Sequence, residues 1–187
     1  MIDKIQLKLF TKDDVPVEGY VPVFHRWIRE RVLDELMIDV VDYSHVADGP
    51  HVVLIGHEVD YALDRGRGKL GLLFVHKRGP RPERLSHALA RAVKAALLLE
   101  AEKGAEHPLK FRSDALLIRI ADRLNAPNTD ATYERLLPGL KRDLEALFGA
   151  GKFELKRVGS AREPFTVEVK AEGAAPLADL AKRLSVS

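Results

Sequence analysis

The alternation of apolar and polar residues near the start of the chain predicts a strand, and a different spacing predicts a helix after it. Ile5, Leu7 and Leu9 point to one face of a strand over residues 2–10, and the intervening Lys and Gln residues point to the other. Over residues 20–36 apolar residues recur at every third or fourth position, as on the buried side of a helix. We therefore expect a half-buried strand followed by an amphipathic helix.

The rest of the chain gives two further groups of elements, separated by the polar segment 104–113. Before this segment we expect strands over 37–43, 52–63 and 69–77 and an Ala- and Leu-rich helix over 83–103. After it we expect a strand over 115–121, a helix over 130–148, strands over 153–158 and 165–170, and a short helix over 176–184. Pro138-Gly139 predicts a kink or a break in the longer helix.

This order of elements favours an α+β fold made of a tandem βαββα duplication, with helices packed on a mainly antiparallel sheet. Residues 1–103 form the first unit, which has one extra strand; residues 104–113 join the units, and residues 114–187 form the second. The units share element order and little residue identity. The alternative is a ferredoxin-like βαββαβ unit over residues 2–122 with a βαββα-type appendage.

Composition narrows the classes of protein to consider. Of 187 residues, 46% are hydrophobic and 31% are charged, the mix typical of a folded globular domain. The net charge of +2 is too small for general polyanion binding, and the absence of cysteine excludes disulfides and thiolate catalysis. Apolar runs are too short to span a membrane, and residues 1–10 alternate and carry charge, unlike a signal peptide. We therefore expect no membrane association and a cytoplasmic location.

Histidine, the commonest metal ligand and the side chain that titrates nearest neutral pH, is unevenly distributed. All seven histidines precede residue 111, so we expect the first unit to carry any histidine chemistry and the second to be structural, packed on the first. The run of His, Asp and Glu over residues 39–64 matches no established metal-ligand spacing. Motifs of nucleotide-binding proteins and hydrolases are also missing. The sequence therefore leaves metal and cofactor undefined.

The hairpin around the DRGRG turn, residues 64–68, supplies a candidate acid–base group. If the turn is centred on Gly66, Glu58 pairs with Phe74, and the carboxylates of this strand share an apolar face with a histidine. Apolar neighbours raise carboxylate pKa values, and a carboxylate pair with histidine suits general acid–base catalysis. The candidate catalytic residues are His57, Glu58, Asp60 and His76.

A structural interpretation of the same residues is simpler, and we favour it. Glu58 and Asp60 then make ion pairs where their strand reaches solvent, as polar residues of half-buried strands commonly do. His57 is then a core histidine whose ring is hydrogen-bonded to the backbone.

Basic residues between 65 and 91 form two patches, because the strand over 69–77 holds them about 26 Å apart. One patch lies at the hairpin tip. The other, HKRGPRPER, precedes a helix, whose N-terminal N–H groups favour anions. The loop over 44–50 is a further candidate, because loops carry function disproportionately. The candidate ligand- or anion-binding residues are Arg78 and Arg81 in the second patch, and Asp42 and His45 beside the loop.

Three functions fit these features. The leading one is a binding or assembly protein that recognises a protein or a small, anionic ligand, with a protein partner or self-association. The alternative is a small-molecule enzyme that uses His/carboxylate acid–base or metal chemistry on an anionic substrate. Nucleic-acid binding is a minor alternative, because aromatic residues make up only 6% of the chain and the basic patches are separated.

Overall fold

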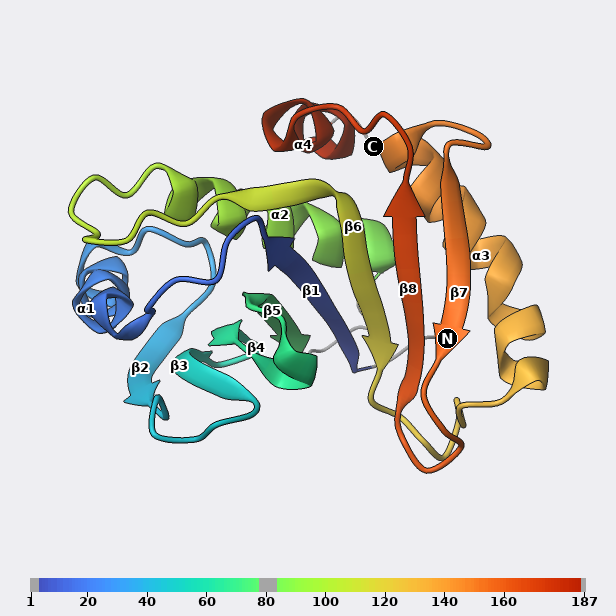
Figure 1. The fold of residues 1–187 in the computed structure, drawn as a ribbon, viewed down its shortest axis with the longest axis horizontal. Helices are drawn as coiled ribbons and strands as arrows, with labels where there is room; N and C mark the ends of the chain where they lie inside the picture. The colour runs from blue at the N-terminus through green and yellow to red at the C-terminus, as the bar shows by residue number, and fades with distance from the viewer. Residues whose placement is uncertain (1–3, 78–83, 186–187) are drawn as a thin grey trace.

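The computed structural model describes residues 4–77 and 84–185, which form eight strands and four α-helices (Figure 1). The strands are β1 (Ile5–Thr11), β2 (Met37–Asp42), β3 (Pro50–Gly56), β4 (Val59–Asp64), β5 (Gly71–His76), β6 (Phe111–Ile120), β7 (Phe153–Val158) and β8 (Phe165–Ala171). The helices are α1 (Val21–Glu30), α2 (Leu85–Glu100), α3 (Asp130–Phe148) and α4 (Leu177–Ser185), with short 3₁₀ turns η1 (Glu18–Tyr20) and η2 (Gly66–Gly68). No helix within these residues is long and apolar enough to cross a membrane.

All eight strands belong to one antiparallel sheet in the order β2-β3-β4-β5-β1-β6-β8-β7. The α+β class with a mainly antiparallel sheet is therefore confirmed. Four strands lie between α1 and α2, where a βαββαβ unit has two, and the ferredoxin-like alternative stays a prediction. The tandem duplication and its boundary at 104–113 stay predictions.

Helix α1 ends earlier than the apolar pattern predicts, because Arg31 leaves the helical conformation. Its φ of 52° and ψ of 50° are left-handed, and its N–H donates to the Ile28 carbonyl at 3.3 Å. Pro22 lies in the first turn, where its missing N–H costs no helical hydrogen bond. Trp27 is buried, and its indole N–H donates to Glu102 Oε1 at 2.8 Å, which ties α1 to the end of α2.

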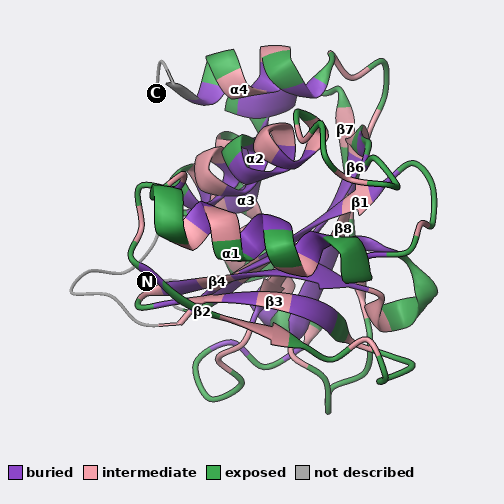
Figure 2. Cartoon of the chain, turned by 90° about the vertical axis from the view of Figure 1, so that its left-hand side faces the viewer, coloured by how far each residue is buried: buried purple, intermediate pink, exposed green. Residues whose placement is uncertain are grey.

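The core lies on the helix side of the sheet, where alternate strand residues meet the apolar faces of the helices (Figure 2). In β1 these are Ile5, Leu7 and Leu9, all nearly inaccessible, as the alternating pattern predicts. Helix α2 faces them with alanines, whose small side chains allow a close approach of helix and sheet; the buried ones are Ala88, Ala92, Ala95 and Ala96.

The single strand predicted over 52–63 is wrong. The chain turns back at His57-Glu58, so that β3 and β4 are neighbouring antiparallel strands in which Ile55 faces Asp60. Gly56 makes this turn possible: a Cβ at this position would lie 2.4 Å from the Val59 carbonyl oxygen and 2.6 Å from Met37 Cε. In the sequence, an apolar run with one glycine resembles a continuous strand. The turn becomes evident only in the structure, where the backbone of Val59 comes close to Gly56.

We expect Gly56→Ala to lower the free energy of unfolding by about 1–3 kcal/mol, because the added methyl group meets backbone as well as a side chain. The matched control is Gly104→Ala, since a Cβ at Gly104 meets no atom within 4 Å. Urea unfolding followed by circular dichroism measures both variants. Equal unfolding midpoints for the two variants would show that the turn does not need glycine.

Candidate functional site

The predicted acid–base group does not form, because the register of its hairpin differs from the predicted one. Val59 faces His76 and Asp60 faces Val75, a shift of three residues from the predicted pairing. An odd shift moves side chains to the opposite face of a strand. His76 is therefore buried on the helix side, whereas Asp60 points to the other face. His57, which we expected in the core, is exposed in the β3–β4 turn.

Asp60 and Glu58 hold the β3–β4 turn against the end of β5. The Asp60 carboxylate lies 2.7 Å from Lys77 Nζ and accepts the Gly56 N–H at 3.1 Å. The Glu58 carbonyl accepts the Lys77 N–H at 2.9 Å. The ion-pair interpretation of Asp60 is confirmed. The contacts of Asp60 and Glu58 join the β3–β4 turn to the residue that follows β5.

Of the candidate binding residues, Asp42 and His45 lie within the described part of the chain, beside the same loop. Asp42 is exposed beside the 44–50 loop, and its pKa is lowered by the Ser44 hydroxyl and N–H that donate to it. His45 is exposed in the same loop. Arg78 and Arg81 lie outside the described residues. Within the described residues no group of three or more His, Asp and Glu side chains is arranged to hold a metal ion.

The face of the sheet opposite the helices carries a different cluster. In Figure 1, α2 lies behind β1 and β6 and α3 behind β7, and the other face of the sheet is turned toward the viewer. On this helix-free face Gln6 of β1 faces Arg119 of β6, and Lys8 faces Leu117. Glu168 of β8 faces Leu117 from the other side. In the row Lys8, Leu117 and Glu168, charged and apolar side chains therefore alternate across three neighbouring strands.

A cavity of about 240 Å³ lies on this helix-free face. It is lined by Lys8, Phe10, Asp64, Gly66, Arg67, Lys69, Leu73, Leu117, Arg119 and Glu168. A second cavity of about 230 Å³ adjoins it, since both are lined by Phe10, Lys69 and Glu168. We call the first one the central cavity. Its four basic and two acidic side chains leave a formal excess of two positive charges.

A buried ion pair between Lys8 and Asp64 forms one wall of the central cavity. The Nζ and Oδ2 atoms are 2.5 Å apart, and Nζ also donates to the Gly66 carbonyl at 2.8 Å. Burial lowers the pKa of Lys8, against the opposing effect of Asp64. Gly71 leaves the room that the lysine needs, because a Cβ there would lie 3.0 Å from Lys8 Cε. The pair fixes the start of the η2 turn to β1.

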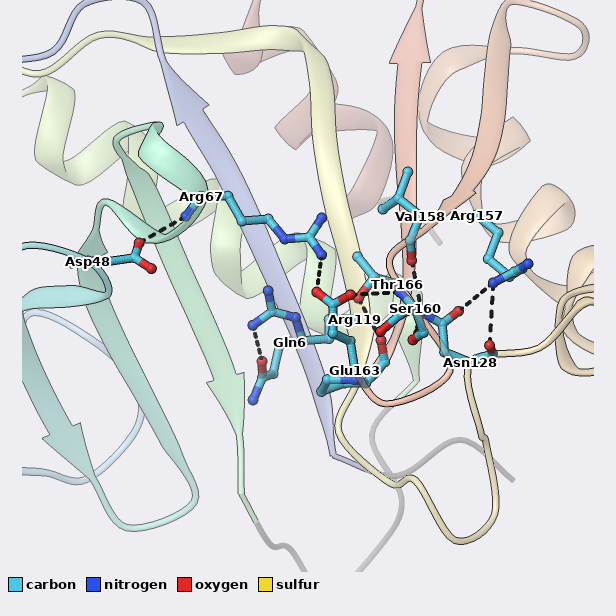
Figure 3. Close-up of polar contacts among 11 residues, drawn as sticks. Gln6, Asp48, Arg67, Arg119, Asn128, Arg157, Val158, Ser160, Glu163 and Thr166 are labelled. Carbon is cyan, nitrogen blue, oxygen red and sulfur yellow. Dashed lines mark hydrogen bonds and ion pairs between the residues drawn. The ribbon is translucent and has the colours of Figure 1, made fainter.

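The η2 turn directs Arg67 over the sheet. Arg67 has a φ of 64° although it is not glycine, a conformation that costs about 1–2 kcal/mol. Its N–H donates to Asp48 Oδ1 at 3.1 Å, and its guanidinium lies 2.8 Å from Glu163 Oε1 in the β7–β8 loop. Figure 3 shows this side chain extending from the turn to Glu163, beside Arg119 and Gln6.

Arg119 lines the central cavity without a carboxylate partner among the described residues. Its Nη1 donates to Gln6 Oε1 at 3.3 Å, while its Nε is buried with no hydrogen-bond partner among the described residues. Burial lowers the pKa of Arg119, and the positive charge of Arg67 lowers it further. Lys69, whose Nζ lies 5.7 Å from the centre of the Phe10 ring, likewise has no carboxylate partner within the described part of the chain. The cavity thus holds positive charge that its own carboxylates do not pair.

Sequence analysis did not select Lys8, Asp64 or Arg119. Lys8 and Arg119 looked like ordinary polar residues of half-buried strands, and the basic patch at the hairpin tip was the one available signal for Arg67 and Lys69.

Neither a comparison with protein-family models nor one with curated proteins finds a match to this chain.

Replacing Lys8 by methionine tests the buried pair. We expect Lys8→Met to lower the free energy of unfolding by about 3–5 kcal/mol, because it leaves the Asp64 carboxylate buried without its cation. The double variant Lys8→Met/Asp64→Leu removes that charge and should recover at least half of the loss. Urea unfolding at neutral pH measures both. A single variant as stable as the unmodified protein would contradict the role given to the pair.

Proposed function

We propose that this protein binds a small anionic ligand in the central cavity. This is the small-ligand form of the binding function predicted from the sequence. The single observation that carries it is the buried Nε of Arg119, a donor without a partner among the described residues in a cavity with excess positive charge. A buried donor without an acceptor is costly, and a bound anion would supply the acceptor.

The side chains of the central cavity suit an anion in their hydrogen-bonding geometry as well as in their charge. Arginine presents planar donors that match the oxygen atoms of carboxylates and phosphates, and two arginines, Arg67 and Arg119, line the cavity. Phe10, Leu73 and Leu117 add apolar surface around them. A few convergent polar groups in a partly apolar cavity are typical of small-ligand sites.

Binding is better supported than catalysis. The predicted acid–base residues are dispersed over a turn, a buried core position and the helix-free face, and Asp60 already has a structural ion pair. Nothing in their arrangement favours the enzymatic alternative over the binding function. Nucleic-acid binding has no added support, because Phe10 is the only aromatic residue among the described ones that line the central cavity.

The tandem duplication remains part of the proposal, and the sheet order supports it. β1 and β6, the first strands of the two predicted units, lie side by side at the middle of the sheet, and each precedes a helix and antiparallel strands. The central cavity takes Lys8 and Asp64 from the first unit and Arg119 and Glu168 from the second. We therefore assign the second unit a share in ligand binding, beyond the structural role predicted for it.

Self-association stays a prediction. β2 is an edge strand of the sheet, and Leu36 and Ile38 beside its start are exposed. Unpaired edges are common sites of pairing between chains.

Replacing Arg119 tests the proposed function. We expect the unmodified protein to bind at least one of acetate, benzoate, sulfate and inorganic phosphate saturably, and Arg119→Gln to weaken this binding about 10-fold or more, because charge-assisted hydrogen bonds are lost. Isothermal titration calorimetry at constant ionic strength is the measurement. Arg142→Gln is the matched control, since Arg142 is exposed on α3 and paired with its neighbour Asp143. Equal affinities of the Arg119 and Arg142 variants, or no saturable binding at all, would contradict the proposal.

A further inference from the structure

The carboxylate of Glu163 is paired with Arg67, which lines the central cavity. We propose that Glu163 occupies the anion position next to Arg67 in the unliganded protein, and that a doubly charged anion of the phosphate type displaces it on binding. This inference rests on the proposed anion-binding function and adds to it the class of ligand and the group that competes with the ligand.

The Arg67–Glu163 ion pair crosses the helix-free face and joins two loops distant in sequence. Arg67 comes from the turn between β4 and β5, and Glu163 from the loop between β7 and β8 (Figure 3). The side chains are 39% and 46% exposed, so water screens their attraction. Exposed ion pairs of this kind contribute little to stability. A ligand with a stronger charge can therefore replace the carboxylate without unfolding the loop.

Hydrogen bonds within the β7–β8 loop orient the Glu163 carboxylate and favour its ionised form. Glu163 Oε2 accepts the Ser160 N–H at 2.6 Å, and the Ser160 carbonyl accepts from the buried Asn128 side chain at 3.2 Å. Gly159, with a φ of 85°, provides the sharp turn just before. The hydrogen bonds from Ser160 and then from Arg67 lower the pKa of Glu163, which keeps it ionised at neutral pH. The carboxylate is thus anchored independently of Arg67, so it survives as a defined group when Arg67 takes another partner.

Charge favours a dianion over a monoanion in the central cavity. Arg67 and Arg119 both line it and lie close enough for the charge of Arg67 to lower the pKa of Arg119. Glu163 supplies one negative charge, at the Arg67 end, and it leaves the Arg119 Nε without a partner. A carboxylate ligand would only exchange one monoanion for another. A phosphate dianion has oxygen atoms for both guanidinium groups and matches the formal excess of two positive charges.

The displacement test uses inorganic phosphate and acetate as the probes, with the full chain at pH 8 and constant ionic strength in calorimetry. We expect phosphate to bind at least 10-fold more tightly than acetate. Glu163→Gln should raise phosphate affinity a further 3- to 10-fold, because the competing charge is gone. In an Arg67→Gln background the same Glu163→Gln change should have no effect, because Glu163 then has no cation to occupy.

Two control variants separate displacement from general electrostatics. Glu168→Gln removes a carboxylate that lines the same cavity but has no ion pair with Arg67, so its effect should be smaller than that of Glu163→Gln and should persist in the Arg67→Gln background. Glu134→Gln removes an exposed charge on α3 and should change nothing.

The outcomes distinguish this inference from the proposed function. Anion binding that depends on Arg119 but is unaffected by Glu163→Gln, or is equal for acetate and phosphate, overturns the inference and leaves the proposed function standing. Failure of acetate, benzoate, sulfate and phosphate alike to bind the unmodified protein and the Glu163→Gln variant overturns both.

Discussion

The antiparallel pairing of β1 with β6 is the interaction on which the rest of the structure depends. It joins β2–β5 on one side to β8 and β7 on the other, and no other pair of strands links these two groups within the described residues. One face of this pair carries Leu7 and Ile118 into the core beneath the helices. The opposite face carries Lys8 and Arg119 toward the central cavity. A single register thus sets both the packing of the core and the spacing of the charges.

Some polar groups on the helix-free face have hydrogen-bond or ion-pair partners among the described residues, and others do not. Lys8 donates to both Asp64 and the Gly66 carbonyl, and it thereby fixes the turn that carries Arg67 and Lys69. Arg119 lies on the neighbouring strand, and its one side-chain hydrogen bond to a described residue is the 3.3 Å bond to Gln6. The first arrangement belongs to a stable fold. The second leaves the Arg119 Nε without an acceptor among the described residues, and we propose that a ligand supplies it.

The sequence is informative where local chemistry decides the structure. Helix α3 begins and ends where predicted, because the Thr129 side chain accepts the Thr132 N–H at its start and Gly149 follows its end; Pro138 lies inside it without ending it. The strand 153–158 also matches its predicted bounds. The turn at His57 was missed because Gly56 is surrounded by apolar residues typical of a strand. The central cavity was missed because the neighbours of Arg119 depend on which strands pair. The predicted β4–β5 register was also wrong by an odd number of residues, which exchanges the two faces of the sheet.

The most direct test of this account is the side-chain NMR signal of Arg119 Nε–H during a titration with inorganic phosphate. The signal is assigned by its absence in Arg119→Gln. The account predicts a saturable shift of this signal, larger than that of any arginine on the helix side of the sheet. An Arg119 Nε–H signal that stays unchanged at phosphate concentrations that saturate the protein, or at any phosphate concentration, would contradict it.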